Sequence, residues 1–358
     1  MGNAIRYYVI AVAISLTIAA GSSTADEPLS VHKLDEEKGV RSGRFCTTAA
    51  LLQFSACKNE VADDNLTARA FCTNVSDDQD REDCLQEARS TQADDGMRCH
   101  NQLRARRDLC QKLGEGRYDP DLDPDLFDDD VANPTSPNPY FPLTVGNKWT
   151  FEGGDNEVST DEVLDKTKLI EGVTCLVVRN VASRGGRIIE VTDDWYGLRK
   201  NRDVNYCGEQ VQNFETFAGD DPAEPELIDT GGSFKAGRQA MPGLIFPGFP
   251  TVGLVYRQEW APGDAEDVAE VVSINYGFGA DRKLDEHMLP ALAKLLCSND
   301  CVVTRDYSPI EPGAFAFKFY ARGLGMFYEV AVDEEGNVEV FQLVACNFDA
   351  RCSRLPAP

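Results

Sequence analysis

The chain has 358 residues, with 35 Lys and Arg against 60 Asp and Glu, which gives a formal net charge of −25. This acidic balance argues against nucleic acids and anionic membranes as partners, because both would repel it. The twelve cysteines are even in number, and the chain has no Cys-x-x-Cys pair and only three His. That pattern favours a disulfide framework over zinc sites.

The start of the chain is typical of a secretory signal peptide. Arg6 precedes an almost unbroken apolar run of 14 residues, Tyr7 to Ala20, and small residues follow at Ser23-Thr24-Ala25. An uncleaved anchor, the alternative, would need about 20 apolar residues. We therefore predict cleavage at the end of residues 1–25, a disordered segment at 26–43, and a mature chain without a membrane span that is periplasmic or secreted.

Residues 44–113 are predicted to form a helical module held by six cysteines. The lengths between these cysteines, 10, 14, 11, 14 and 10 residues, read the same in both directions. Cysteines eleven positions apart lie on nearly the same face of a helix, so two antiparallel helices would present matched cysteines to each other. The nested pairing that uses this symmetry is Cys46–Cys110, Cys57–Cys99 and Cys72–Cys84.

The turn of this hairpin is expected near residues 74–79, with Ser76 or Asp77 as the N-cap of the second helix. A break of the first arm into two helices is expected at Asp63-Asp64-Asn65. In geometry the module resembles the mitochondrial twin-cysteine helical hairpins, although those use Cys-x9-Cys spacing. It would serve either as a docking surface or as a stabilising cap on the rest of the chain.

Residues 114–140 are rich in Asp and Pro, which predicts a stiff, extended, solvated linker. The alternating acids at its start are similar to the first ligands of an EF-hand calcium loop. The Gly and bidentate Glu that such a loop needs are absent in either register. We predict no cofactor, and calcium stays open as an alternative with the ligands Asp121, Asp123, Asp125 and Asp128.

From residue 141 to 358 the chain has short runs of Val, Ile, Thr, Tyr and Phe broken by Gly, Asp and Pro, which predict antiparallel strands. Residues 333–337 are typical of a hairpin turn. Residues 280–298 have the apolar spacing of a helix, which Pro290 should kink. The fold class is therefore α+β, with a disulfide-stapled helical hairpin followed by a mainly antiparallel β domain that carries a helical insertion.

The β domain also contains a weak internal repeat. In both copies an aromatic residue lies five positions after a matched threonine, Thr144 or Thr251, and a Glu lies eight positions after it. Two matched halves predict an internally duplicated domain that is either barrel-like or sandwich-like. The matched segments are Phe141–Gly146 with Phe249–Gly253, Cys175–Asn180 with Cys301–Asp306, and Trp195-Tyr196 with Phe319-Tyr320.

The second set of six cysteines lies in the β domain. Cys297 and Cys301 are close in sequence beside the inserted helix, and Cys346 and Cys352 suggest a C-terminal clasp. A redox role for the first pair is the alternative, but redox cysteines prefer a helix N-terminus, and this pair follows a helix C-terminus. By elimination the remaining pair is Cys175–Cys207.

Several blocks of the β domain resemble a family of uncharacterised exported bacterial proteins. The resemblance covers about residues 138–345 and implies kinship and export but no activity, because none is assigned to that family. The inserted helix and Cys207 depart from the family pattern. The blocks are Asn138–Leu143, Asp194-Trp195-Tyr196, Tyr256–Glu259, Ala265-Glu266-Asp267 and Glu311-Pro312-Gly313.

Candidate site residues are few. No Gly-x-Ser-x-Gly element occurs, and His287 is the only His of the large domain, which argues against a serine hydrolase. Paired carboxylates beside aromatic side chains are typical of glycosidases, and the apolar stretch 241–249 could line a ligand mouth. The candidate carboxylates are Glu259, Asp264, Glu266 and Asp267, and the candidate ligand-binding aromatics are Trp195, Tyr196, Tyr256, Trp260, Phe246 and Phe249.

These observations favour an exported, non-catalytic binding or interaction protein of the bacterial envelope or secretome. Its partner would be a protein, a glycan or an apolar small molecule. The alternatives are an exported hydrolase of a polysaccharide or related polymer that uses the paired carboxylates, and a calcium-dependent interaction module.

Overall fold

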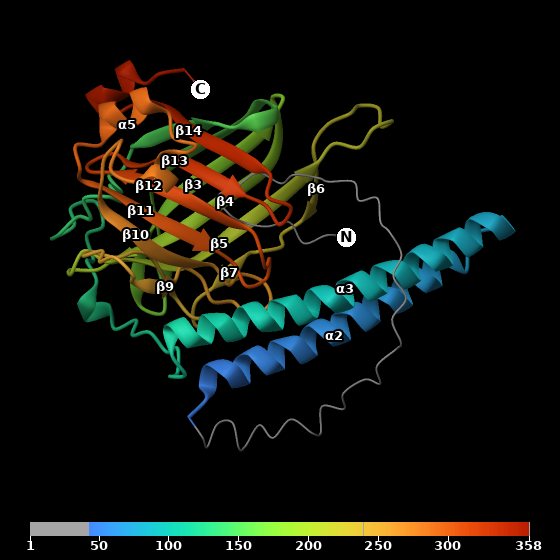
Figure 1. Cartoon of the computed structure of the whole chain (residues 1–358). Helices are drawn as coiled ribbons and strands as arrows, with labels where there is room; N and C mark the ends of the chain where they lie inside the picture. Colours follow the sequence, from blue (N-terminus) through green and yellow to red (C-terminus); the bar gives the residue numbers. More distant parts are fainter. Residues whose placement is uncertain (1–42, 239, 358) are drawn as a thin grey trace. The chain divides into compact units, whose positions relative to one another are not determined.

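The computed structural model describes residues 43–238 and 240–357. The predicted signal peptide and, apart from Gly43, the segment at 26–43 lie outside these residues. The described chain forms two compact units, a helical one up to Tyr118 and a β unit from Asp119 onward (Figure 1). No helix among the described residues has the length and apolar character that crossing a membrane would require.

The helical unit is a hairpin of α2 (Phe45–Cys72) and α3 (Asp78–Leu113). The Asp77 carboxylate accepts hydrogen bonds from the first turn of α3, as a helix N-cap does, which confirms one of the two predicted caps. The cysteines form the nested ladder that their spacing predicts, with the pairs Cys46–Cys110, Cys57–Cys99 and Cys72–Cys84.

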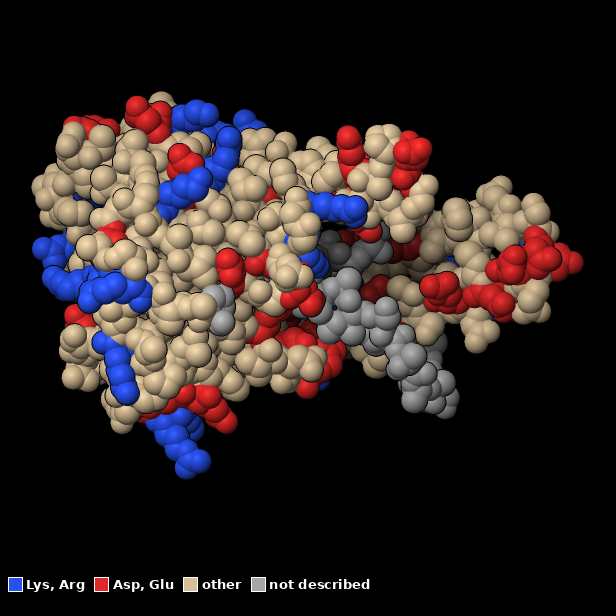
Figure 2. Space-filling model, turned by 90° about the horizontal axis from the view of Figure 1, so that it is seen from above, with Lys and Arg blue, Asp and Glu red and all other residues tan. Residues whose placement is uncertain are grey.

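The expected break in the first arm is absent, and α2 is continuous. Asn65 is buried and its Nδ2 donates to the Ala88 carbonyl of α3 at 2.9 Å, so this polar residue joins the two helices. The apolar core of the hairpin is small and consists of Phe54, Val61 and Cys99 with little around them. Acidic side chains gather at the turn end of the hairpin, at the right of Figure 2. Disulfides rather than apolar burial therefore carry much of its stability.

The β unit is built on one antiparallel sheet of fourteen strands. Short 3-10 helices lie at Pro124–Leu126, Gly154–Asn156 and Ala350–Arg354. The strands are β1 (Lys148–Glu152), β2 (Glu157–Ile170), β3 (Val173–Arg184), β4 (Arg187–Leu198), β5 (Val204–Glu215), β6 (Glu226–Asp229), β7 (Phe234–Lys235), β8 (Gly243–Phe246), β9 (Val255–Arg257), β10 (Val268–Tyr276), β11 (Cys301–Tyr307), β12 (Phe315–Ala321), β13 (Gly325–Val332) and β14 (Val338–Cys346).

Two meanders make up this sheet, β1 to β5 and β9 to β14, and they are joined where β1 pairs with β14. The sheet folds over so that the inner faces of the two meanders pack against each other (Figure 1). The strand order runs from β6 at one edge to β9 at the other without closing into a barrel. Of the two architectures predicted, the structure therefore has the sandwich-like one.

The predicted duplication is visible in repeated backbone hydrogen bonds. Gly146 N–H donates to the Val163 carbonyl, and Gly253 N–H donates to the Val271 carbonyl, each at 2.8 Å. Val163 and Val271 in turn donate to the loops before β1 and β9, each at 2.9 Å. Both glycines have a positive φ, 87° and 85°, that glycine adopts without strain. Each half thus begins with the same kind of turn, bonded to β2 in the first half and to β10 in the second.

A different segment of the chain packs on the outer face of each half. On the second half the insertion forms α4 (Arg282–Asp285) and α5 (Pro290–Leu296), and Pro290 begins α5 and so separates the two helices. On the first half Phe127 is buried against the outer side of β3 and β4. Residues from Asp119 onward, which include most of the predicted linker, belong to the compact β unit.

Gly243 lets β8 approach the loop that follows β9. A Cβ on this residue would lie 1.6 Å from the backbone oxygen of Gln258, which nothing but a backbone shift can relieve. We expect Gly243→Ala to lower the free energy of unfolding by about 3 kcal/mol, the upper part of the range for overpacking. Denaturant titration checks this, with Gly116→Ala as the control because nothing lies within 4 Å of its Cβ position. Equal stability of the two variants would contradict it.

Candidate functional site

A cavity of about 80 Å³ lies between the two halves of the β unit. Its polar side chains are Asp161 from β2, Lys318 from β12 and Gln258 from the loop after β9. Apolar and aromatic side chains supply most of the remaining wall, among them Leu143, Trp149, Phe151, Val178, Tyr196 and Met326.

The Asn138–Leu143 block closes one end of this interior. Asn138 Nδ2 donates to the carbonyls of Arg202 and Pro247 at 2.9 and 3.1 Å, and both belong to loops of the first half. The Tyr140 hydroxyl donates to the Asp300 carbonyl at 2.8 Å in the second half. The block therefore ties the two halves together at the cavity.

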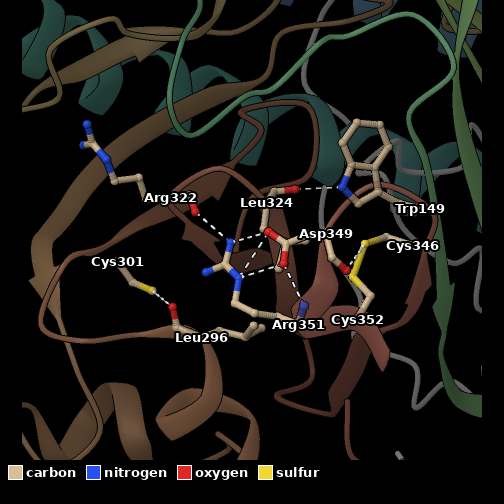
Figure 3. A network of polar contacts seen from close by, with 9 residues as sticks. All are labelled: Trp149, Leu296, Cys301, Arg322, Leu324, Cys346, Asp349, Arg351 and Cys352. Atoms are coloured by element: carbon tan, nitrogen blue, oxygen red, sulfur yellow. Dashed lines mark hydrogen bonds and ion pairs between the residues drawn. A yellow bond between two sulfur atoms is a disulfide. The ribbon is translucent and has the colours of Figure 1, made fainter. Parts of the chain in front are cut away.

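Trp149 and the C-terminal clasp hold the β12–β13 turn (Figure 3). The strand that follows this turn, β13, supplies Met326 to the cavity wall. Trp149 Nε1 donates to the Leu324 carbonyl at 2.7 Å. Arg351 Nη2 donates to the Arg322 carbonyl at 2.8 Å and forms an ion pair with Asp349 at 2.7 Å. The Cys346–Cys352 disulfide fixes the segment that carries Arg351. This wall of the cavity is therefore rigidly positioned.

Asp161 is the acidic group of the cavity wall. It is partly buried, and its remaining exposed surface lines the cavity. Asn180 Nδ2 donates to its carboxylate at 2.6 Å and also donates to Ser159 Oγ at 2.7 Å. Burial raises the pKa of Asp161 to about 6, and the hydrogen bond from Asn180 opposes that rise. The carboxyl group is therefore mainly ionised at neutral pH.

A buried ionic cluster lies on the second half, around Lys318. Its Nζ is 3.2 Å from Asp306 Oδ2, and both side chains are almost fully buried. Burial raises the pKa of Asp267 to about 7 and that of Glu329 to about 8, and Lys318 counteracts both shifts. Burial alone would lower the pKa of Lys318, but the surrounding carboxylates raise it above its usual value. The ammonium group therefore stays charged.

The candidate carboxylates of the 259–267 stretch lie in a tightly folded loop. Gln258 and Glu259 both donate their N–H to the Asp267 carbonyl, at 2.7 and 3.1 Å. Glu266 accepts from the Gly263 N–H at 2.8 Å and, like Glu259, is buried. Burial, with the Glu266 charge, raises the pKa of Asp264. None of these carboxylates lines the cavity, so the hydrolase hypothesis gains no support from its geometry and stays a sequence prediction.

The candidate aromatic residues divide into two groups. Tyr196 lines the cavity, and Phe246 packs beside it against Tyr320 with ring centroids 4.7 Å apart. Tyr256 is buried next to this layer. The second group lies elsewhere: Trp195 is on the outer face under Lys168, Trp260 is beside Arg257, and Phe249 is 68% exposed.

Of the wall residues, Tyr196 is the one named as a sequence candidate, and Ile245 lies in the apolar stretch 241–249. The sequence does not single out the two charged side chains, Asp161 and Lys318, or the aromatic Trp149 beside them. The available signal was strand register. Trp149 opposes Asp161 across β1 and β2, so an inward-facing aromatic residue implies an inward-facing carboxylate.

Three of the four predicted calcium ligands, Asp121, Asp123 and Asp128, accept hydrogen bonds within their own segment. The Asp121 and Asp123 carboxylates accept from the backbone N–H two residues ahead, at 2.8 and 3.0 Å. Asp128 is buried and accepts from the Thr135 N–H and hydroxyl. Within the ranges that the structure describes, no group of three or more metal-binding side chains is placed to hold a metal ion. Calcium binding stays a prediction of the sequence.

Comparison with known proteins gives a limited result. No family model matches the chain, and no curated protein matches it. A "putative lipoprotein" of Parabacteroides distasonis is 11% identical, with 59% of this chain and 99% of that one covered and a TM-score of 0.27. A "putative exported protein" of Bacteroides fragilis with a YmcC-like fold is also 11% identical, with 58% and 98% covered and a TM-score of 0.28. Similarity at this level carries no argument about function.

Proposed function

We propose that this chain is an extracytoplasmic, non-catalytic binding protein whose β unit takes a small ligand into the cavity between its halves. The observation that carries the proposal is the mostly apolar cavity with Asp161 and Lys318 in its wall. Ligand pockets of this kind combine an apolar surface with a few polar groups that fix orientation. All twelve cysteines are paired, which supports an oxidising compartment.

The size of the cavity limits the guest. Pockets for drug-sized ligands span roughly 300–1,000 Å³, whereas this one has about 80 Å³. A water molecule takes about 30 Å³ of liquid volume. The cavity therefore fits a molecule of a few heavy atoms, or one end of a longer ligand.

The test is uptake of an apolar probe. Xenon should bind the protein saturably, measured by the ¹²⁹Xe chemical shift, because small apolar cavities take up xenon. Val178→Phe fills the cavity from a buried wall position and should abolish that uptake. The control is Val338→Phe on β14, which makes the same change at an exposed site.

The thermal transition of each variant shows that it is folded. Should Val178→Phe misfold, saturable xenon uptake and a rise in Tm with isobutanol in the unmodified protein decide the question. Absence of both in the unmodified protein would overturn the proposed function.

A further inference from the structure

We propose that the ligand of this cavity carries a positively charged nitrogen on a small apolar body, and that Asp161 is its counterion. This inference rests on the proposed function and names the chemical class of the ligand. An alkylammonium group is the simplest member of that class.

Asp161 keeps hydrogen-bond acceptor capacity on the side that faces the cavity. In the described part of the chain, Asn180 is the one side chain that donates to this carboxylate, and no cation pairs with it. An ionised carboxylate has about four acceptor sites. A buried charge is costly unless it is paired and hydrogen-bonded. The unused acceptor capacity faces the cavity, where a donor on the ligand would meet it.

Lys318 is the cation of the cavity wall. Its ammonium group is in contact with Asp306 and is further neutralised by Asp267 and Glu329. An anionic ligand would have to compete with these buried carboxylates. The Asp161 carboxylate can therefore pair with a ligand, whereas the Lys318 ammonium group is already paired within the protein. This arrangement favours a cationic ligand.

The two halves of the β unit carry opposite charges at the position of Lys318. Val178 opposes Asp194 across β3 and β4, and Thr304 opposes Lys318 at the equivalent place across β11 and β12. The first half thus has a carboxylate where the second half has its ammonium group. In the second half a buried acid and an internal lysine form an ion pair at 3.2 Å. The position that supplies an internal ammonium group in the second half therefore supplies none in the first half, where the Tyr206 hydroxyl donates to Asp194 instead.

The experiment compares three guests with the same branched body: isobutylammonium, isobutanol and isobutyrate. Dissociation constants come from calorimetry at pH 7.5. Isobutylammonium should bind about ten- to a hundredfold more tightly than isobutanol, as expected for a charge-assisted hydrogen bond. Isobutyrate should bind more weakly than either.

Asp161→Asn should remove the preference for the ammonium guest while xenon and isobutanol still enter. The matched control is Asp165→Asn, the same change at an exposed position of the same strand, which should keep the preference.

Equal binding of isobutylammonium and isobutanol would overturn the inference, and so would a preference that survives in Asp161→Asn. Either result with xenon still taken up leaves the proposed function standing. If no guest and no xenon bind, both proposals fail together. If Asp161→Asn does not fold, the ranking of the three guests on the unmodified protein decides.

Discussion

Mild reduction is expected to unfold the helical hairpin while the β unit stays folded. The hairpin has a small apolar core, and its disulfides close loops of 64, 42 and 12 residues. In the chain-entropy account each such link contributes about 3–4 kcal/mol. In the β unit two of the three disulfides close loops of only 4 and 6 residues, and the core spans both halves of the sheet.

Two signals separate these units. All three tryptophans, Trp149, Trp195 and Trp260, belong to the β unit, so their fluorescence reports on it alone. Circular dichroism at 222 nm follows the helices. As reductant is added, helical signal should be lost while tryptophan emission is unchanged. Loss of both signals at the same reductant concentration would refute the division.

Paired variants make the comparison sharper. Replacing Cys57 and Cys99 with Ser should melt much of the hairpin, and replacing Cys346 and Cys352 with Ser should leave it intact.

Lys318→Met is expected to destabilise the β unit strongly. The change leaves Asp306, Asp267 and Glu329 buried without their common cation. Removing one partner of a buried ion pair costs about 3–5 kcal/mol. Denaturant unfolding followed by tryptophan fluorescence measures the loss. Lys166→Met, at an exposed position of β2, is the control and should change little.

The loss should depend on pH. Because burial raises the pKa values of Asp267 and Glu329 to about 7 and 8, the folded state holds protons that the unfolded state releases above about pH 4. Stability of the unmodified protein should therefore fall as the pH rises from about 4 to 8. In Lys318→Met the fall should be steeper, and adding Asp306→Asn should restore part of the stability. A loss no larger than in the control at pH 8 would contradict the role of this cluster.

The hairpin and the duplication were predictable because each depends on local spacing. The cysteine intervals follow helical geometry, and the residue type at Asp77 marks a helix start. The repeat around Gly146 and Gly253 reflects one turn used twice. The stretch before Tyr140 is rich in Asp and Pro, and composition of that kind does not report the packing of Phe127 on the sheet.

The cavity was not predictable for a different reason. Sequence reasoning places polar residues of a strand toward solvent, yet Asp161 and Lys318 point inward. They are also far apart in the chain, so no local cluster indicates them. The acidic stretch around Glu259 is a local cluster and therefore stands out in the sequence as a candidate site. In the structure it forms a closed loop that does not line the cavity.

The pairing of β1 with β14 has a consequence for how this unit can be connected. Its first and last strands are neighbours in the sheet, with Trp149 opposite Cys346. A short peptide could therefore join them, and a cut between the two meanders could supply new ends. Such a circular permutant would keep every strand pair while reversing the order in which the halves are synthesised. The strand pairing therefore does not depend on which of the two halves comes first in the chain.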